Sequence, residues 1–216
     1  MNRVRPIIDR SVKAAYVGAV PEPRRLTPRG RERRAQLIAY ATSQFADKGY
    51  HPTSVADIVD GLGVGKGVFY WYFDSKEMLF EEILREAQKD MRRRLQKAIA
   101  DVDDPVERIG LAIRASVHWS AEHRDLFKLF EFAQTDQRFS GLIQAGRKVL
   151  AHDAVPQLSD AIARGEIPDG DPEQLAHAIL GVTIHLTMVY IHQRGESPER
   201  IADVVVDFCL RGIGAG

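Results

Sequence analysis

A short stretch from Lys66 to Tyr70 combines side chains that can bind a phosphate backbone and contact a base pair. Lys66 supplies an ammonium group, and a helix that starts there adds free backbone N–H groups that attract phosphate oxygens. The hydroxyl group of Tyr70 can fix the register of the helix on the DNA backbone. The methyl groups of Val68 can contact the methyl group of thymine in the major groove. These residue types predict a helix that binds DNA.

Patterns typical of catalysis or metal binding are missing from the sequence. It contains no phosphate-binding loop, dinucleotide-binding glycine pattern or nucleophile elbow. No two of the 7 histidines stand three or four residues apart, and His185 and His192 would lie about 10 Å apart along a helix. His118 and Glu122 have i, i+4 spacing, which is more typical of a solvated helix surface than of a metal site. We therefore expect no enzyme, no metal site and no cofactor.

Three helical segments are expected around the DNA-binding stretch. Apolar residues recur at helical spacing over residues 31–49. Ser54 and Asp57 have the spacing of a capping box, which predicts the start of a second helix. The glycine-rich turn at 63–65 then precedes a third helix at 66–73, and the central valine of that turn can lie between the two helices. Two short helices joined in this way and preceded by a supporting helix predict a helix-turn-helix.

The rest of the chain also shows helical periodicity and no strand pattern, so the expected fold class is all-α. Further helices are expected over residues 76–100, 105–123, 124–135, 139–167, 172–194 and 198–213. Pro156 predicts a kink in the helix at 139–167. Residues 1–30 are rich in arginine and proline and lack an apolar period, which predicts a disordered basic arm.

A formal net charge of zero hides an asymmetry between the two halves of the chain. Residues 1–100 hold 19 Lys and Arg against 12 Asp and Glu, whereas residues 101–216 hold 11 against 18. This asymmetry favours a first half that faces a polyanion, although unequal solvated surfaces would also produce it.

The cysteine content and the hydropathy of the chain indicate in which cellular compartment the protein is expected. The only cysteine, Cys209, excludes an intrachain disulfide, and the N-terminus lacks the pattern of a leader peptide, so we expect a cytoplasmic protein. The longest apolar stretch, Ala178–Ile191, has about fourteen residues against the roughly twenty that cross a bilayer. We therefore expect a buried helix there and no membrane partner.

Four strings of residues carry a resemblance to a known family. They are FADKGY at 45–50, TSVADI at 53–58, GVGKGVFYWYF at 63–73 and SKE at 75–77. Over about residues 31–80 these strings closely resemble the DNA-binding domain of the TetR/AcrR family of bacterial transcriptional regulators. The later helices are similar to the effector-binding and dimerisation domain of that family in number and order only.

The resemblance implies a role for individual residues. Ser54 caps the helix that crosses the DNA backbone, whereas Gly67 and Val68 face base edges. The side chains implied to contact DNA phosphates are those of Thr53, Lys66, Tyr70, Trp71 and Lys76. The sequence departs from many relatives at Gly65, where they have Ser or Thr, and at Trp71, where they have His. Trp71 can therefore stack on a sugar or pack on the neighbouring helix instead.

The resemblance also divides the chain into a disordered basic arm (1–30), a helix-turn-helix domain (31–75) and a helical bundle for effector binding and dimerisation (76–216). The last two helices are expected to form the dimer interface, with intrachain packing as the alternative for each residue. The predicted interface residues are Leu175, Ile179, Val182, Leu186, Val189, Ile201, Val205 and Phe208. The residues predicted to line an effector cavity are Trp119, Phe127, Phe130, His118 and His185.

Together these features predict a homodimeric transcriptional repressor that binds a palindromic double-stranded DNA operator. An effector bound in the C-terminal domain, expected to be a small and largely apolar molecule, would change the affinity for the operator. The alternative is a helical adaptor that binds other proteins and never contacts DNA. An adaptor offers no reason for a basic first half, and DNA binding would weaken steeply with salt.

Overall fold

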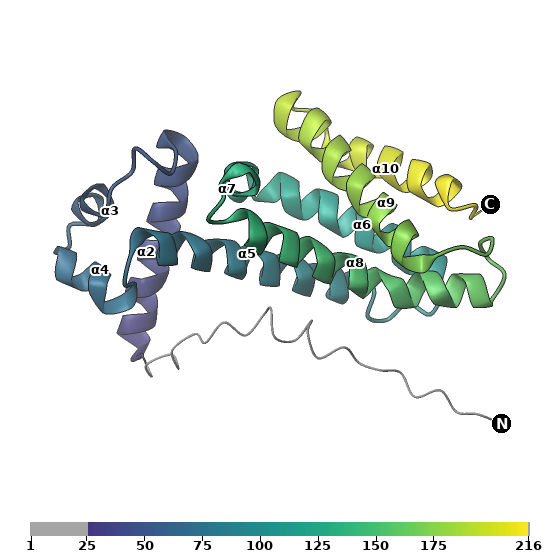
Figure 1. Cartoon of the computed structure of the whole chain (residues 1–216), viewed down its shortest axis with the longest axis horizontal. Helices are drawn as coiled ribbons and strands as arrows, with labels where there is room; N and C mark the ends of the chain where they lie inside the picture. The colour runs from purple at the N-terminus through teal and green to yellow at the C-terminus, as the bar shows by residue number, and fades with distance from the viewer. Residues whose placement is uncertain (1–25, 216) are drawn as a thin grey trace.

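The computed structural model describes residues 26–215, and every regular element within them is helical. The elements are α2 (Pro28–Lys48), α3 (Val55–Gly61), α4 (Lys66–Tyr72), α5 (Lys76–Ala98), α6 (Pro105–Glu122), α7 (Arg124–Thr135), α8 (Ser140–Ala163), α9 (Pro172–Leu186), the π-helical segment η1 (Thr187–Gln193) and α10 (Pro198–Gly212). Helices α2, α3 and α4 form one end of the molecule, and α5, α6 and α8 run lengthwise away from it (Figure 1). The all-α prediction is confirmed.

Polar side chains fix where several helices begin. The capping box predicted at Ser54 is present: Asp57 N donates to Ser54 Oγ at 3.1 Å, and Ser54 N donates to the Asp57 carboxylate at 2.7 Å. Ser75 and Asp104 cap α5 and α6 in the same way. Each such cap satisfies a backbone N–H that has no partner within the helix. The sequence locates these starts because capping is a local interaction.

The first helix begins earlier than predicted. Thr27 caps α2, accepting a hydrogen bond from Gly30 N at 3.1 Å, and Pro28 occupies the first helical position. Proline is favourable there because its missing N–H needs no partner. The predicted arm at 1–30 is therefore wrong for residues 28–30, and residues 1–25 of that prediction lie outside the described part of the chain.

Two of the long helices also differ from the prediction. Helix α8 continues through Pro156 and ends at Ala163, after which Gly165 adopts a φ of 70° that favours glycine. The single helix predicted at 172–194 is split into α9 and the π-helical η1. Short π-helical segments within longer helices are uncommon, and they often occur at functional sites.

The buried side chains form two cores. One core joins α2, α3 and α4 to the first turns of α5 and to α7, with Phe69, Phe80 and Phe139 among its largest members. The other core lies among α6, α8, α9, η1 and α10, where α9 packs on α8 and α10 packs on α6. The end of the molecule formed by α2, α3 and α4 therefore shares its core with α7 and the start of α8.

Candidate nucleic-acid interface

Helix α4 turns a polar and aromatic face to solvent. Lys66 and Gly67 are exposed at its first turn, Tyr70 is 53% exposed and Trp71 is 60% exposed. A Cβ atom added at Gly67 would meet nothing within 4 Å, so the backbone there is open to a large partner. Val68 is half-buried beside this face. The structure thus brings the predicted phosphate-binding and base-reading groups of α4 together on one surface.

The opposite side of α4 anchors it to the protein. Phe69 and Phe73 are buried in the core, as expected for aromatic residues at helical spacing. In the preceding turn, Gly63 takes a φ of 63° and Val64 packs against the same core. A residue with positive φ at this point makes the sharp reversal between α3 and α4 possible. The predicted helix-turn-helix is confirmed, with α4 as its second helix.

The N-terminus of α4 lacks the side-chain cap that α3 has. Gly65 occupies the N-cap position and makes no side-chain hydrogen bond, so the first amide groups of α4 remain available to an anion. In α3, by contrast, Ser54 also donates from Oγ to Asp57 at 2.6 Å. Hydrogen bonds from Ser54 lower the pKa of the Asp57 carboxyl group. The hydroxyl of Ser54 therefore has a structural role at an exposed position.

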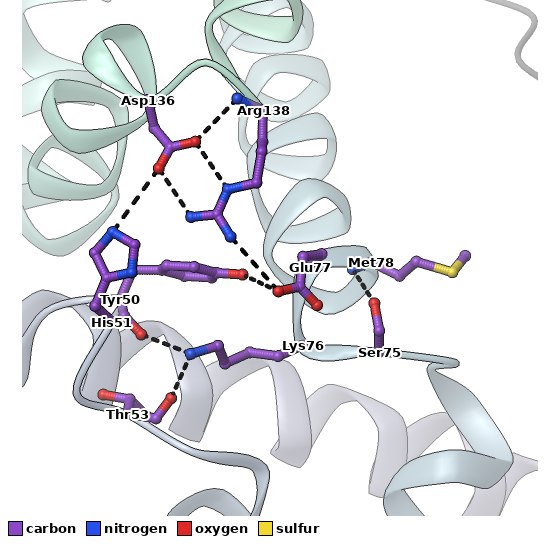
Figure 2. A network of polar contacts seen from close by, with 9 residues as sticks. All are labelled: Tyr50, His51, Thr53, Ser75, Lys76, Glu77, Met78, Asp136 and Arg138. Carbon is purple, nitrogen blue, oxygen red and sulfur yellow. Dashed lines mark hydrogen bonds and ion pairs between the residues drawn. The ribbon is translucent and has the colours of Figure 1, made fainter.

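Thr53 and Lys76 both make hydrogen bonds to the backbone around the connector between α2 and α3. Thr53 is fully buried, and its hydroxyl donates to Gly49 O at 2.8 Å. Lys76 Nζ donates to Tyr50 O at 3.0 Å and to Thr53 O at 2.9 Å (Figure 2). Burial lowers the pKa of Lys76. Both side chains hold the connector between α2 and α3, because its carbonyl groups would otherwise lack partners. The burial of Thr53 contradicts its predicted phosphate contact, whereas the phosphate contact of the half-buried Lys76 stays a prediction.

A cavity of about 320 Å³ lies among α5, α6, α8 and α9. Its walls are largely apolar, and include Leu95, Ile113 and Leu180. Arg92 lies at the lining and donates from Nε and Nη2 to the Asp153 carboxylate at 2.5 and 2.8 Å. A cavity with apolar walls and a few polar groups is the usual form of a small-molecule site.

None of the five residues predicted to line an effector cavity lines this one. Trp119 is buried and donates from Nε1 to Asp90 at 2.8 Å, and Phe127 stacks on His192 with ring centroids 3.7 Å apart. Phe130 packs against the core of the DNA-reading end. The other two predictions, His118 and His185, are half-buried and exposed, respectively.

The sequence does contain one signal for this cavity. Small residues recur on the faces of α6 and α9 that line it, as at Ala112, Ser116 and Ala176. Small side chains on facing helices leave space between them that larger ones would fill. Attention to aromatic residues led the prediction away from this stripe.

The predicted dimer interface separates into buried, half-buried and exposed residues. Ile201 and Val205 are 3% and 0% exposed in the intrachain core, so their assignment to the interface is wrong. Phe208 is 59% exposed, and Val204, another apolar residue of the last helix that was expected at this interface, is 48% exposed. The remaining predicted residues, all on α9 and η1, are half-buried: Leu175, Ile179, Val182, Leu186 and Val189.

Helix α9 carries further exposed apolar surface beside α10. Ala178 and Gly181 are exposed, and a Cβ atom at Gly181 would meet nothing within 4 Å. The stretch Pro172–Gln193 has a mean hydropathy of 1.4, so its length and composition alone would allow it to cross a membrane. In this fold the stretch packs on α8 and lines the cavity, but only 22% of its most apolar part is buried, so the expectation of a buried helix is wrong for most of these residues.

The described residues 26–215 contain no group of three or more His, Cys, Asp or Glu side chains that could hold a metal ion. Cys209 is buried in this range and has no disulfide partner, and burial raises the pKa of its thiol to about 11. A thiol with such a pKa is a poor nucleophile. The chemistry of the described part is therefore concentrated on α4 and in the cavity.

The fold and the exposed face of α4 define a helix-turn-helix DNA-binding regulator. Two family models make this assignment specific. The model described as "Bacterial regulatory proteins, tetR family" matches residues 37–83, and that described as "Tetracyclin repressor-like, C-terminal domain" matches residues 102–213. The chain belongs to the TetR family of bacterial transcriptional regulators, which act by binding operator DNA and are not enzymes.

Individual relatives agree with this assignment. The HTH-type transcriptional regulator YdgC of Bacillus subtilis is 25% identical over 189 residues, covering 86% of this chain and 94% of the relative. The HTH-type transcriptional repressor KstR2 of Mycolicibacterium smegmatis is 36% identical over 92 residues, 43% of this chain and 44% of the relative. The solved structure of the ketosteroid transcriptional regulator KstR2 of Mycobacterium tuberculosis has a TM-score of 0.67 and 26% identity, over 84% of this chain and 94% of that one.

Proposed function

We propose that this regulator is a repressor that binds a palindromic operator as a homodimer in the bacterial cytoplasm. The observation that carries the proposal is the exposed face of α4, on which a cation, a tyrosine and a tryptophan surround an uncapped helix N-terminus. A relative over the DNA-reading part, KstR2 of Mycolicibacterium smegmatis, is itself a transcriptional repressor. Two copies of α4 related by a twofold axis would enter successive major grooves about 34–36 Å apart.

Within this proposal, the residues of the interface have different tasks. Lys66, Tyr70 and Trp71 contact phosphates or sugars and set the register of α4 on the DNA. Gly67 and Val68 lie closest to the base edges, where the absence of a side chain at position 67 lets the backbone approach the groove. Phosphate contacts supply affinity for any sequence, whereas base contacts supply preference.

The proposed dimer interface is the outward face of α9 and α10. Val204 and Phe208 are large apolar side chains exposed on α10, and the small residues Ala178 and Gly181 are exposed on α9, which packs on α10. Small residues on one helix allow another helix to approach closely, and large apolar ones supply buried area on association. A twofold axis through this face would form a four-helix interface from two copies of α9 and α10.

The proposed effector occupies the cavity among α5, α6, α8 and α9. At about 320 Å³ the cavity lies at the lower end of the range for small-molecule sites, and its walls favour a compact, largely apolar molecule. The solved relative KstR2 is described as a ketosteroid regulator, and a ketosteroid is a largely apolar molecule. An effector that binds one spacing of the two DNA-reading ends more tightly than another would shift the operator affinity.

The test is selection of bound sequences from a random duplex library, repeated with Lys66 and Tyr70 both changed to alanine. We expect a palindromic sequence to be enriched by the unaltered protein and lost with the double variant. Retention of the fold in the variant is checked by circular dichroism. No enrichment at low salt would contradict operator binding as a homodimer and would favour a function that needs a co-regulator.

A further inference from the structure

An aromatic side chain of the DNA-reading end is inserted into the effector-binding domain. Tyr50 follows α2, which ends at Lys48, and it is 3% exposed. Its ring stacks on Phe132 of α7 with centroids 5.3 Å apart, and it contacts Phe139 at the start of α8 at the same distance. Aromatic pairs at such distances stabilise a fixed arrangement beyond the area that they bury. Tyr50 therefore packs the connector after α2 directly against α7 and the start of α8.

A polar layer surrounds this ring (Figure 2). The hydroxyl of Tyr50 donates to Glu77 Oε1 at 3.0 Å, and Glu77 lies in the first turn of α5. Arg138 Nη1 lies 3.6 Å from the same carboxylate oxygen. Arg138 also donates from Nε and Nη2 to Asp136 at 3.0 and 2.9 Å, so the turn between α7 and α8 holds the guanidinium group in place. Bidentate pairs of this kind fix orientation as well as charge.

Two cations also lie on the ring of Tyr50. Lys76 Nζ is 4.3 Å from the ring centroid, and the guanidinium carbon of Arg138 is 5.0 Å from it. Cations at such distances are attracted by the ring. Lys76 belongs to the DNA-reading side because it binds the connector 50–53, whereas Arg138 belongs to the effector side. The ring is thus held between one cation at the start of α5 and one in the turn between α7 and α8.

Two helices run from this junction to the cavity. Glu77 and Arg92 lie on α5, about 22 Å apart at 1.5 Å per residue. Helix α8 starts beside Arg138 and lines the same cavity from Leu150 to Gln157. Any molecule that separates α5 from α8 in the cavity acts on both helices that meet at the junction.

A close contact joins α5 and α8 between the junction and the cavity. Gln88 Nε2 donates to Leu142 O at 3.3 Å, and a Cβ atom at Gly146 would lie only 2.4 Å from the Gln88 side chain. The other amide atom of Gln88, Oε1, is buried without a hydrogen-bond partner. A buried polar atom without a partner costs free energy, so the position of this side chain is not explained by hydrogen bonding alone. The contact keeps the two helices together at one point while their ends can move.

We propose that Tyr50, Glu77 and Arg138 form a latch that positions the DNA-reading end against the effector domain, with the Gln88–Gly146 contact as its pivot. The latch transmits occupancy of the cavity to α4. This inference rests on the proposed effector site, and it assigns positioning roles to three residues that contact neither DNA nor cavity. Opening of the latch releases the Tyr50 connector, and with it the support of α3 and α4.

The test uses a substitution that fills the cavity in place of a ligand. Ala112 lines the cavity, and Ala112→Phe, with Ala112→Leu as a milder version, occupies part of its volume. We expect Ala112→Phe to lower operator affinity about tenfold in the unaltered protein, a size common for coupling between two sites. In the background of Tyr50→Phe or Arg138→Gln, the same substitution should lower affinity by less than about threefold. Arg138→Lys retains the charge and should restore part of the response.

A matched control separates the latch from a general loss of charge. Arg85 pairs with Glu81 on the same helix at 2.7 Å and does not reach the other domain. In the Arg85→Gln background, Ala112→Phe should retain its full effect on operator affinity. If Ala112→Phe lowers operator affinity equally in the Arg138→Gln and Arg85→Gln backgrounds, the latch is overturned. It is also overturned if Ala112→Phe alone has no effect on operator affinity.

A second readout does not depend on operator binding. Nitroxide labels at Asp60→Cys on the exposed face of α3, in protein with Cys209 changed to serine, report the separation of the two DNA-reading ends by pulsed electron resonance. Ala112→Phe should shift the distribution of distances between the two labels when Tyr50 is unaltered. The same substitution should leave the distribution unchanged in a protein that also carries Tyr50→Phe. A shift without operator binding would refute the proposed function and keep the latch. The same shift in both backgrounds would refute the latch alone.

Discussion

Two surfaces of this regulator expose large aromatic or apolar side chains to a similar degree, but their surroundings differ. On α4, Tyr70 and Trp71 are 53% and 60% exposed next to Lys66 and an uncapped helix N-terminus. On α10, Val204 and Phe208 are 48% and 59% exposed next to the apolar surface of α9. The first surface offers donors and positive charge to a polyanion, and the second offers area to another apolar surface. Exposure alone does not identify a partner, and it is the neighbouring groups that indicate which kind of partner fits each surface.

Each of the two helices is anchored by buried side chains on the face opposite its exposed surface. Phe69 is fully buried behind α4, and Ile201 and Val205 anchor α10. Substitutions on the exposed sides therefore leave the cores intact, and each surface can be altered without unfolding the domain that carries it.

The largest effect is expected at the apolar surface. Phe208→Asp places a charge in the centre of the proposed dimer interface, and we expect the dimer dissociation constant to rise by about a hundredfold or more. Operator affinity should fall with it, because a single α4 contacts only one half-site. Sedimentation analysis measures the first effect. Met78 is 43% exposed away from α9 and α10, so Met78→Asp is the matched control and should leave the dimer unchanged.

Smaller effects are expected from substitutions on the α4 surface. One substitution should lower the affinity for all DNA, and another should weaken the preference for one base pair. Lys66→Ala should weaken binding to all DNA sequences alike and reduce the slope of log affinity against log salt by about one. Val68→Ala should leave that slope unchanged but relax the preference at one base pair by about 1–3 kcal/mol. Anisotropy titrations at several salt concentrations distinguish the two. Equal salt slopes for Lys66→Ala and the unaltered protein would show that Lys66 does not contact phosphate.

The sequence predicts local features of this structure well. The capping box at Ser54, the turn around Val64 and the buried ring of Phe69 all follow from interactions within a few residues, and all are confirmed. Most helix boundaries are close for the same reason, but α2 begins earlier than predicted, at Pro28 after the Thr27 cap, and α8 ends earlier, at Ala163.

Features that depend on distant parts of the chain are predicted less well. Ile201 and Phe208 are both apolar residues of α10, and only the position of α6 decides that the first is buried and the second exposed. The hydrogen bonds of Lys76 to the carbonyl groups of the connector 50–53 do not follow from its place in the sequence. The cavity and the latch around Tyr50 arise where helices far apart in sequence meet, and small residues on two of the helices are the only local sign of the cavity.

Two partly buried basic side chains, Lys76 and His192, have different surroundings, and the difference leads to a prediction about pH. Lys76 keeps its hydrogen bonds to two carbonyl groups, whereas His192 is held neutral: burial, and then the nearby charge of Arg124, lower its pKa to about 4. An unfolded chain binds a proton at this histidine below about pH 6.5, and the folded chain does not until about pH 4. Stability should therefore fall as pH decreases through this window, and stay constant with respect to this group below it.

The expected loss is about 2 kcal/mol, after allowance for the partial exposure of the ring. His192→Gln removes the titration and can keep a hydrogen bond to Ser120, whose Oγ lies 2.9 Å from His192 Nε2. Urea unfolding of the two proteins at about pH 7 and about pH 4.5 measures the difference. His177 is exposed, so His177→Gln is the control and should not alter the pH dependence. A parallel fall in stability for His192→Gln would assign the effect to other groups.

The smallest effect is expected from a substitution that gives α4 the cap that it lacks. Gly65 has a φ of −78° and a ψ of 154°, which any residue adopts, and a Cβ atom there would meet nothing within 4 Å. Gly65→Ser should stabilise the protein by a few tenths of a kcal/mol, because serine caps a helix only slightly better than glycine. Its hydroxyl also adds a group that can reach a phosphate, so operator affinity should rise by about two- to threefold at low salt. Gly141 is the first-turn glycine of α8 with equally open surroundings, and Gly141→Ser should leave operator affinity unchanged. A loss of affinity in Gly65→Ser would mean that the backbone at position 65 approaches the DNA too closely for a side chain, and α4 would then insert more deeply than its exposed aromatic residues indicate.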